Sequence, residues 1–287
     1  MIVFCVDMDN TLIYSYKHID RLQSESGPNM AGQNASDQGS AGRHAAAQGS
    51  AGQNAFGQWI CVETYQGREI SFISRKTHQL LMELKERALI VPVTTRTVEQ
   101  YRRIDLQIGN ISYALACNGG ILLHMDRTDD AWYRRSFDMV QESRTELQRA
   151  AEYLSEEKNR IFELRVIEDL FVFTKCKNPA ETTARMQGLL DLKLTDVFYN
   201  GEKVYVVPKQ LNKGNALKRF RDYIRADYML SAGDSIFDRP MLHEADLAAA
   251  PAGCAFGALT EEHIHVMPGK KLFSEELLAF LLNKIKK

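Results

Sequence analysis

The sequence is poor in cysteine and shows no regular cysteine pattern. Five cysteines occur among 287 residues, and no two have the CxxC spacing. A disulfide framework or a zinc knuckle needs a paired, regularly spaced set, so we expect neither. We expect reduced and mostly buried thiols, which are typical of a cytoplasmic protein.

The sequence also lacks an excess of charge of one sign and any long apolar run. There are 36 Lys and Arg against 37 Asp and Glu, a net charge of −1. Binding to nucleic acid or an anionic membrane needs clustered positive charge, so we expect neither as a partner. No apolar run approaches the roughly 18 residues of a membrane span. The acidic start, MIVFCVDMDN, is not typical of a secretory signal. We therefore expect a soluble cytoplasmic protein, with its oligomeric state left open.

One segment, residues 25–57, contains no Leu, Ile or Val and repeats with a period of ten residues. The repeats read AGQNASDQGS, AGRHAAAQGS and AGQNAFGQ. Such a tract cannot bury enough apolar surface to offset roughly 1–2 kcal/mol of backbone entropy per residue. We expect a disordered insertion in a loop. A flexible lid or partner-binding tether is the alternative.

Strand and helix patterns alternate in the rest of the chain. Short apolar runs predict buried strands at 2–6, 89–93, 113–117, 228–230 and 247–250, and amphipathic patterns predict helices at 74–87, 213–224 and from 274. Between them, 138–207 reads as helix, hairpin, helix, hairpin, with a helix predicted from Asp138 to Leu154 and another starting at Asn178. The fold class is thus α/β: a Rossmann-like parallel-sheet core (1–137 and 208–287) interrupted by a small α+β module (138–207).

Polar clusters follow the predicted core strands. In chain order they are Asp7-Met8-Asp9-Asn10-Thr11, Thr94-Thr95-Arg96, Lys213-Gly214 and Gly233-Asp234-Ser235-Ile236-Phe237-Asp238. Because ligands of open parallel sheets bind beyond the carboxyl ends of the strands, we expect these clusters to converge.

The convergent side chains would suit phosphoryl transfer. Asp7, Asp9, Asp234 and Asp238 would repel one another at short range, and a hard cation such as Mg²⁺ would relieve that repulsion. Thr94 offers a hydroxyl and Lys213 a positive charge to the phosphoryl oxygens. An Asp nucleophile beside a metal and a cation points to an aspartyl-phosphate intermediate.

These four clusters resemble the four motifs of the haloacid dehalogenase superfamily, in that family's order: DMDNT, the strand end at Thr94, Lys213 and GDSIFD. The resemblance implies that Asp7 is the nucleophile and Asp9 the general acid and base. It implies Mg²⁺ held by the Asp7 carboxylate, the Asp9 carbonyl and Asp234, with Asp238 nearby. Thr94 and Lys213 would bind the phosphoryl group.

The inserted module is similar to the family's C2-type cap, in the smaller form of the sucrose-phosphatase-like and Cof-like branch. Asn118-Gly119-Gly120 resembles the turn that precedes such caps. Arg96, Asn118 and Ser235 are further candidates for contacts with the substrate or with the catalytic groups, Arg96 being equally well explained as a structural ion pair. Three positions depart from the family's pattern: Asn10, Thr95 and Phe237.

The sequence therefore favours a Mg²⁺-dependent phosphatase that acts on a small phosphorylated metabolite, most plausibly a sugar phosphate. A phosphomutase of the same superfamily and a non-catalytic phosphate sensor or scaffold are the alternatives. The His263-x-His265 pair lacks a third ligand, so we expect a structural role for it. Phe171 and Phe173 are expected to pack inside the module.

Overall fold

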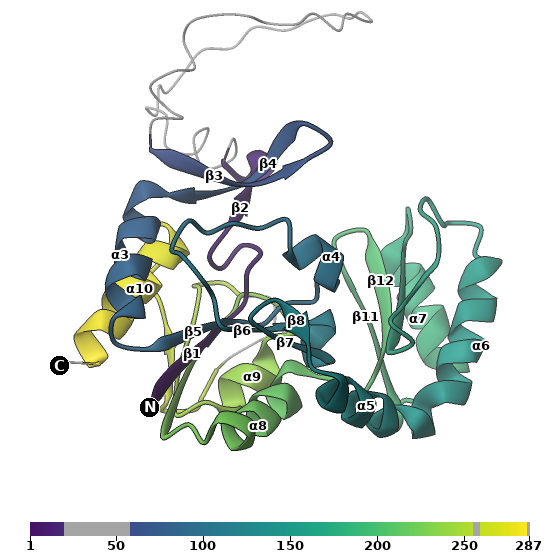
Figure 1. Ribbon diagram of the computed structural model, residues 1–287. Coiled ribbons are helices and arrows are strands. Elements are labelled where there is room, and N and C mark those ends of the chain that lie inside the picture. The colour runs from purple at the N-terminus through teal and green to yellow at the C-terminus, as the bar shows by residue number, and fades with distance from the viewer. Residues whose placement is uncertain (20–57, 255–258, 286–287) are drawn as a thin grey trace, which may run out of the picture.

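The computed structural model describes residues 1–19, 58–254 and 259–285 (Figure 1). The low-complexity segment 25–57, expected to be disordered, lies outside the described residues. Within the described residues, no helix has the length and apolar character needed to cross a membrane.

A five-stranded parallel sheet forms the core, in the order β15-β14-β13-β1-β5. Its strands are β1 (Ile2–Val6), β5 (Leu89–Pro92), β13 (Tyr228–Ala232), β14 (Leu247–Ala250) and β15 (Ile264–Val266). Pro92, which has no N–H to donate, is the last residue of β5, and β5 is an edge strand of this sheet. The predicted α/β class with a parallel core sheet is confirmed.

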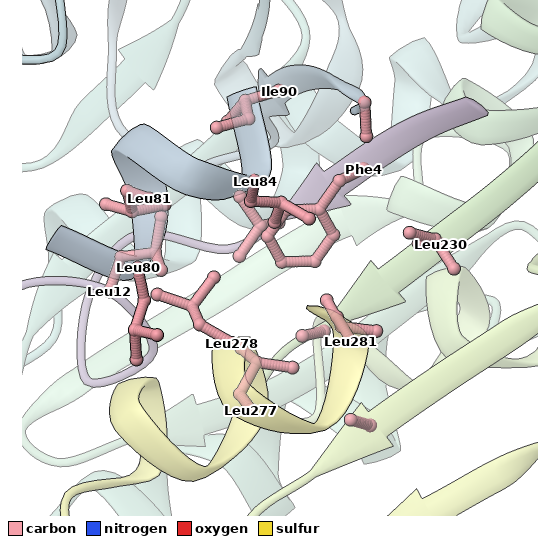
Figure 2. Packing of buried hydrophobic residues seen from close by; sticks show 14 of the residues in the cluster. Phe4, Leu12, Leu80, Leu81, Leu84, Ile90, Leu230, Leu277, Leu278 and Leu281 are labelled. Atoms are coloured by element: carbon pink, nitrogen blue, oxygen red, sulfur yellow. The ribbon is translucent and has the colours of Figure 1, made fainter. Parts of the chain in front are cut away.

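Helices cover both faces of this sheet. Phe4 and Leu230 face α3 (Arg75–Lys85) and α10 (Phe273–Lys284), as Figure 2 shows for the leucines of the two helices. Val3 and Met229 point the other way, toward α8 (Lys213–Ile224) and α9 (Arg239–Glu244). Because successive side chains of a buried strand alternate between faces, an apolar run such as Ile2–Val6 supplies both cores at once.

Helix α3 begins where the sequence predicts. The Ser74 hydroxyl accepts a hydrogen bond from the backbone N–H of Thr77 at 2.9 Å. That bond satisfies one of the free donors at the start of the helix.

A small antiparallel sheet, which we call the flap, lies between β1 and α3 in the sequence. It consists of β2 (Tyr14–Ser15), β4 (Arg68–Ser74) and β3 (Trp59–Tyr65), in that order. Its β3–β4 turn contains Gln66 and Gly67, both at positive φ. The sequence analysis did not predict these strands, although the alternating pattern and Gly67 favour a hairpin.

The module that follows has the predicted order of helix, hairpin, helix and hairpin. Its antiparallel sheet runs β11-β12-β10-β9, and we call the module the cap. Its elements are α6 (Arg144–Ser155), β9 (Arg165–Ile167), β10 (Phe171–Lys175), α7 (Pro179–Leu189), β11 (Thr195–Asn200) and β12 (Lys203–Pro208). One face of the sheet packs on α6 and α7, through Val172 and Val206 among others. The boundaries at 137/138 and 207/208 stay a prediction.

The helix predicted from Asp138 to Leu154 is wrong. The chain forms α5 (Asp130–Met139), a short 3-10 turn (Gln141–Ser143) and then α6. Asp129 is the residue that caps α5, through its bond to the Trp132 N–H at 2.8 Å. The break lets α5 pack on the core, where Trp132 contacts Phe220 of α8, while α6 packs on the cap. Periodicity cannot distinguish two consecutive helices that face different partners.

The remaining elements link the core to the cap. Strands β6 (Tyr113–Ala116), β7 (Ile121–His124) and β8 (Arg127–Thr128) form a small antiparallel sheet. A parallel bridge between Val93 and Leu115 sets β6 beside β5. A single-turn helix, α4 (Val98–Tyr101), follows β5, and Thr97 caps it.

We expect Leu278→Ala to lower the free energy of unfolding by about 2–5 kcal/mol, because it leaves a cavity between α10 and the sheet. Leu278 is fully buried in that core. The matched control is Leu192→Ala, at a side chain that is 43% exposed, which should change stability by less than about 0.5 kcal/mol. Chemical denaturation measures both, and equal losses would contradict the packing described above.

Candidate active site

The predicted site residues gather at the carboxyl ends of three neighbouring core strands. Asp7 directly follows β1, Thr94 follows β5, and Asp234 follows β13. Lys213 is the first residue of α8, and Asp238 directly precedes α9. The convergence expected from the sequence is therefore present.

A buried lysine bridges two of the carboxylates. Lys213 Nζ donates to Asp7 Oδ1 at 2.6 Å and to Asp238 Oδ1 at 2.5 Å. Lys213 is 1% exposed and Asp238 is fully buried. Burial alone would lower the pKa of Lys213, but the charges of Asp238 and Asp7 outweigh it, so its pKa lies above the ordinary value. Lys213 is a buried cation held in place by two acids.

Three carboxylates crowd this lysine. Asp7, Asp234 and Asp238 each offer an oxygen within 4.8 Å of the others. Burial, and next the charge of Asp238, raises the pKa of Asp7 well above its usual range. The same two causes raise the pKa of Asp234 to about 7. One lysine does not neutralise three acids, and a set of hard oxygen donors at this spacing fits Mg²⁺.

The Asp9 carboxylate lies outside this group. It accepts two hydrogen bonds from Arg96, from Nε at 2.8 Å and from Nη2 at 2.7 Å. Burial would raise the pKa of Asp9, but the hydrogen bonds and charge of Arg96 outweigh it and lower the pKa. The structure thus holds Asp9 as an ionised carboxylate with its oxygens on Arg96.

Arg96 is itself fixed by a residue that the sequence analysis missed. Its Nη1 donates to Glu63 Oε1 at 2.9 Å, and the Glu63 side chain is fully buried in β3 of the flap. Ser71 donates to the other carboxylate oxygen at 2.6 Å, and Arg103 forms a second ion pair at 3.2 Å. Of the two roles considered for Arg96, the structural ion pair is present, and it connects the flap to Asp9.

Three other candidates have mainly supporting contacts. The Thr94 hydroxyl accepts the Arg96 N–H at 3.1 Å and is nearly inaccessible. Asn118 Nδ2 donates to the Leu211 carbonyl at 2.8 Å, which ties the turn after β6 to the loop before Lys213. Ser235 donates from its N–H and its hydroxyl to Asp238 Oδ2, at 2.9 and 2.7 Å. Contact of Thr94 with a phosphoryl group stays a prediction.

Two glycines allow the site to close. A Cβ at Gly233 would lie 2.3 Å from the Asp238 side chain, and one at Gly214 would lie 2.5 Å from the Pro240 carbonyl. No side chain fits at either position. The glycines of the Gly233-Asp234 and Lys213-Gly214 motifs are therefore required for packing, which brings Asp238 and Lys213 together.

The two histidines contact groups of the core. His263 Nε2 lies 3.1 Å from the Leu242 carbonyl, and the His265 ring packs against Phe280 at 4.9 Å between centroids. The described residues contain one cluster of three or more potential ligands, the aspartates around Lys213.

A cleft of about 730 Å³ opens between the core, the flap and the cap, and Asp7, Asp9 and Asp234 line its floor. Thr95 lines it, whereas Thr94 does not. From the cap come nine residues: Phe162, Arg165, Ile167, Phe171, Phe173, Lys175, Asn200, Lys203 and Tyr205. Phe171 and Phe173, expected only as packing of the module, thus also face the cleft.

Phe237 of the last motif connects the turn that carries Asp234 and Asp238 to the cap. Its ring packs edge-on against Phe198 at 4.6 Å and Tyr205 at 4.9 Å between centroids. The sequence marked Phe237 as a departure from the family's pattern, and in the structure this aromatic side chain is a contact between core and cap.

Residues 123–252 match the family model of haloacid dehalogenase-like hydrolases. The resemblance to the haloacid dehalogenase family is confirmed. The fold is similar to sucrose-phosphatase from Synechocystis, solved with sucrose and phosphate, at 15% identity over 72% of this chain and 88% of that one, with a TM-score of 0.56.

Two further solved structures have a similar fold. A protein of Thermoplasma acidophilum is 13% identical over 79% of this chain and 94% of its own, with a TM-score of 0.54. A haloacid dehalogenase-like hydrolase from Bacillus subtilis is 15% identical over 74% and 93%, with a TM-score of 0.50. The bifunctional protein GlmU of Methanococcus vannielii is 33% identical over 73 residues, and this chain spans 18% of its length.

We expect Arg96→Gln to raise the pKa of the Asp9 carboxyl, because the variant loses the cation and the two hydrogen bonds that now favour the ionised form. A titration followed by carbon NMR of the Asp9 carboxyl measures it. The matched control is Arg102→Gln, which removes an exposed ion pair with Asp126 and should leave Asp9 unchanged. An unchanged Asp9 pKa in Arg96→Gln would contradict the described pairing.

Proposed function

We propose that this protein is a Mg²⁺-dependent cytoplasmic phosphatase that hydrolyses a small phosphorylated metabolite through an aspartyl-phosphate on Asp7. The observation that carries the proposal is the Lys213 ammonium between Asp7 and Asp238, with Asp234 beside them at the floor of the cleft. The family match to hydrolases supports the same reaction class.

The carboxylates of Asp7 and Asp234, with Asp238 nearby and the Asp9 carbonyl, would hold Mg²⁺. When bound, the ion supplies positive charge that stabilises the phosphoryl oxygens. The chain's own contribution is to hold Asp7 in place: Lys213 and the backbone bond from the Asp7 N–H to the Ala232 carbonyl, 2.9 Å, fix its position.

In the first step, an Asp7 carboxylate oxygen attacks phosphorus and the bond to the leaving oxygen breaks. Asp9 gives that oxygen its proton, so the product leaves as an alcohol. In the second step water attacks the aspartyl-phosphate, Asp9 takes the proton of the water, and phosphate is released with Asp7 regenerated. The second step needs an ionised Asp9, which is the form that Arg96 stabilises. The first needs a protonated Asp9, and the proton that Asp9 takes from the water in the second step supplies it for the next turnover.

A sugar phosphate is the proposed substrate class. The similar fold from Synechocystis is a sucrose-phosphatase solved with sucrose and phosphate. The cleft, about 730 Å³, has the size of a small-molecule site. Its cap wall combines aromatic rings with polar groups.

The test is phosphate release from a panel of phosphorylated compounds, with Mg²⁺ and with EDTA. The panel spans hexose phosphates, disaccharide phosphates, nucleotides and phosphorylated acids. We expect Mg²⁺-dependent release from one class, because bound Mg²⁺ would relieve repulsion among the three aspartates. Release that is equal in EDTA would contradict the metal. If no compound releases phosphate but beryllofluoride still modifies Asp7, a phosphomutase is indicated instead. If there is neither phosphate release nor modification, a sensor or scaffold is indicated.

We expect Asp7→Asn to abolish turnover while the fold remains, because the amide keeps the shape and an acceptor for Lys213 but is a poor nucleophile. Turnover is compared with that of the wild type, and thermal unfolding checks the fold. The control is Asp126→Asn, at an exposed turn distant from Asp7 in the sequence, which should keep full activity. Activity retained by a folded Asp7→Asn protein would remove Asp7 as the nucleophile.

A further inference from the structure

The face of the cap sheet that lines the cleft changes from aromatic to cationic side chains along its strands. Cross-strand register places Arg165, Phe173, Tyr205 and Phe198 in one row across β9, β10, β12 and β11. The next row contains Lys175, Lys203 and Asn200. Phe162 lies beside them, 6.2 Å from the Phe173 ring between centroids. An aromatic row is thus followed by a polar, cationic one.

The two lysines are directly opposite one another. Lys175 on β10 pairs in register with Lys203 on β12, and both line the cleft. Like charges in directly opposed positions of an antiparallel pair destabilise the sheet. Across the described part of the chain, neither lysine forms a salt bridge, although Lys175 Nζ lies 5.3 Å from the centre of the Phe162 ring.

The cap wall of the cleft holds no compensating acid. Its lining includes the cations Arg165, Lys175 and Lys203 and no Asp or Glu. Arg165 is paired with Glu163. Burial lowers the pKa of Lys203, the charge of Asp9 opposes that shift, and the smaller effects of the Lys175 and Arg96 charges lower the pKa further. The acids of the cleft, Asp7, Asp9, Glu63 and Asp234, lie on the core and flap side. Two close lysines on a cap wall without an acid are stabilised when an anion binds beside them.

We propose that Lys175 and Lys203 bind a second anionic group of the substrate, carried by the leaving alcohol. The substrate is then a phosphate monoester of a hydroxy acid or a bisphosphate. This inference rests on the proposed phosphatase function. Among small phosphorylated metabolites it favours those with a second anion, which include sugar bisphosphates and phosphorylated hydroxy acids. The transferred phosphoryl group has its own cation, Lys213, beside Asp7 on the core side. The cap lysines are therefore available for a different anion.

The rest of the cap wall fits the alcohol between the two anions. Phe173 and Tyr205 stack at 5.6 Å between centroids and offer a flat apolar surface next to the lysines. A short carbon chain or a sugar ring can lie against such a surface. Asp9 and Lys203 line the same cleft, so an alcohol held by Lys203 would have its ester oxygen on the side of Asp9. A substrate bound at both ends would hold the cap closed over Asp7.

The test compares substrates that differ in one anionic group, using the full chain with Mg²⁺. One pair is 3-phosphoglycerate and glycerol 3-phosphate, which differ by a carboxylate in place of a hydroxymethyl group. The other is fructose bisphosphate and fructose 6-phosphate, which differ by one phosphate. In at least one pair, we expect kcat/KM to be about ten- to a hundredfold higher for the member with the additional anionic group. That is the effect of a charge-assisted contact. The pair that responds tells carboxylate from phosphate.

The variants Lys203→Met and Lys175→Met keep most of the side-chain length and remove the charge. Each should reduce kcat/KM about tenfold or more for the member with the second anionic group and leave kcat/KM for the member with one phosphate alone unchanged. The control is Lys193→Met, an exposed cap lysine that does not line the cleft, which should change neither. Equal kcat/KM within both pairs, a preference that survives both variants, or equal loss for both members would overturn the proposal.

Binding separates this inference from the proposed function. In an Asp7→Asn background, calorimetry with 3-phosphoglycerate and with fructose bisphosphate measures affinity without turnover. Binding of either that weakens about tenfold with Lys203→Met supports the anion site even where wild-type protein hydrolyses no ester, a result that would refute only the phosphatase. Hydrolysis of esters with one phosphate and no second anion, together with an affinity for both test ligands that Lys203→Met does not change, would refute the anion site alone.

Discussion

The structure depends on a positive charge, that of Lys213, buried at the carboxyl ends of the core strands. Lys213 bonds to Asp7 and Asp238, and these three groups come from the end of β1, the start of α8 and the start of α9. A buried ion pair contributes little net stability against apolar residues of the same size, but removing one partner leaves an uncompensated charge and is costly. The three elements must therefore meet in one arrangement. Gly214 and Gly233 allow it, because a Cβ at Gly214 would collide with the Pro240 carbonyl and one at Gly233 with the Asp238 side chain.

Lys213 does not neutralise all of the negative charge around it, and this excess of negative charge determines the environments of the other acids in the site. Asp7 and Asp234 line the floor of the cleft, and Asp238 is buried beside them. The pKa values of Asp7 and Asp234 are raised because burial and the charge of Asp238 disfavour their ionised forms. Asp9, two residues after Asp7, avoids this because Arg96 binds it, and Glu63 of the flap holds Arg96. Neighbouring carboxylates thus have opposite environments: one group is poised for a cation and the other is kept ionised. Such divergence is how a site assigns different tasks to identical side chains.

The parts of this site that follow strand ends could be predicted from the sequence, and the parts that depend on pairing between distant segments could not. Asp7 and Asp234 come directly after apolar runs, so local pattern and the geometry of parallel sheets are sufficient to bring them together. Glu63 gives no such signal. Its burial depends on how β3 pairs with β4, across register shifts on both sides of Glu63. The single helix predicted from Asp138 to Leu154 is wrong for a related reason. The apolar spacing continues across this stretch, but the surface against which the side chains pack changes from the core to the cap.

The cap face shows the same limit, and there it bears on function. The hairpin around Asn200-Gly201 is evident from the sequence, yet nothing in the local pattern says that Lys203 pairs with Lys175 or that both face the cleft. Register decides this, because a slip of one residue would turn every side chain of β12 to the other face. Phe237 limits such a slip, since its ring packs against Tyr205 of β12 and against Phe198 of β11. The turn that carries Asp234 and Asp238 therefore also supports the strand that presents Lys203. If the cap selects the leaving group and Asp7 attacks phosphorus, as we propose, Phe237 is one contact that couples the two.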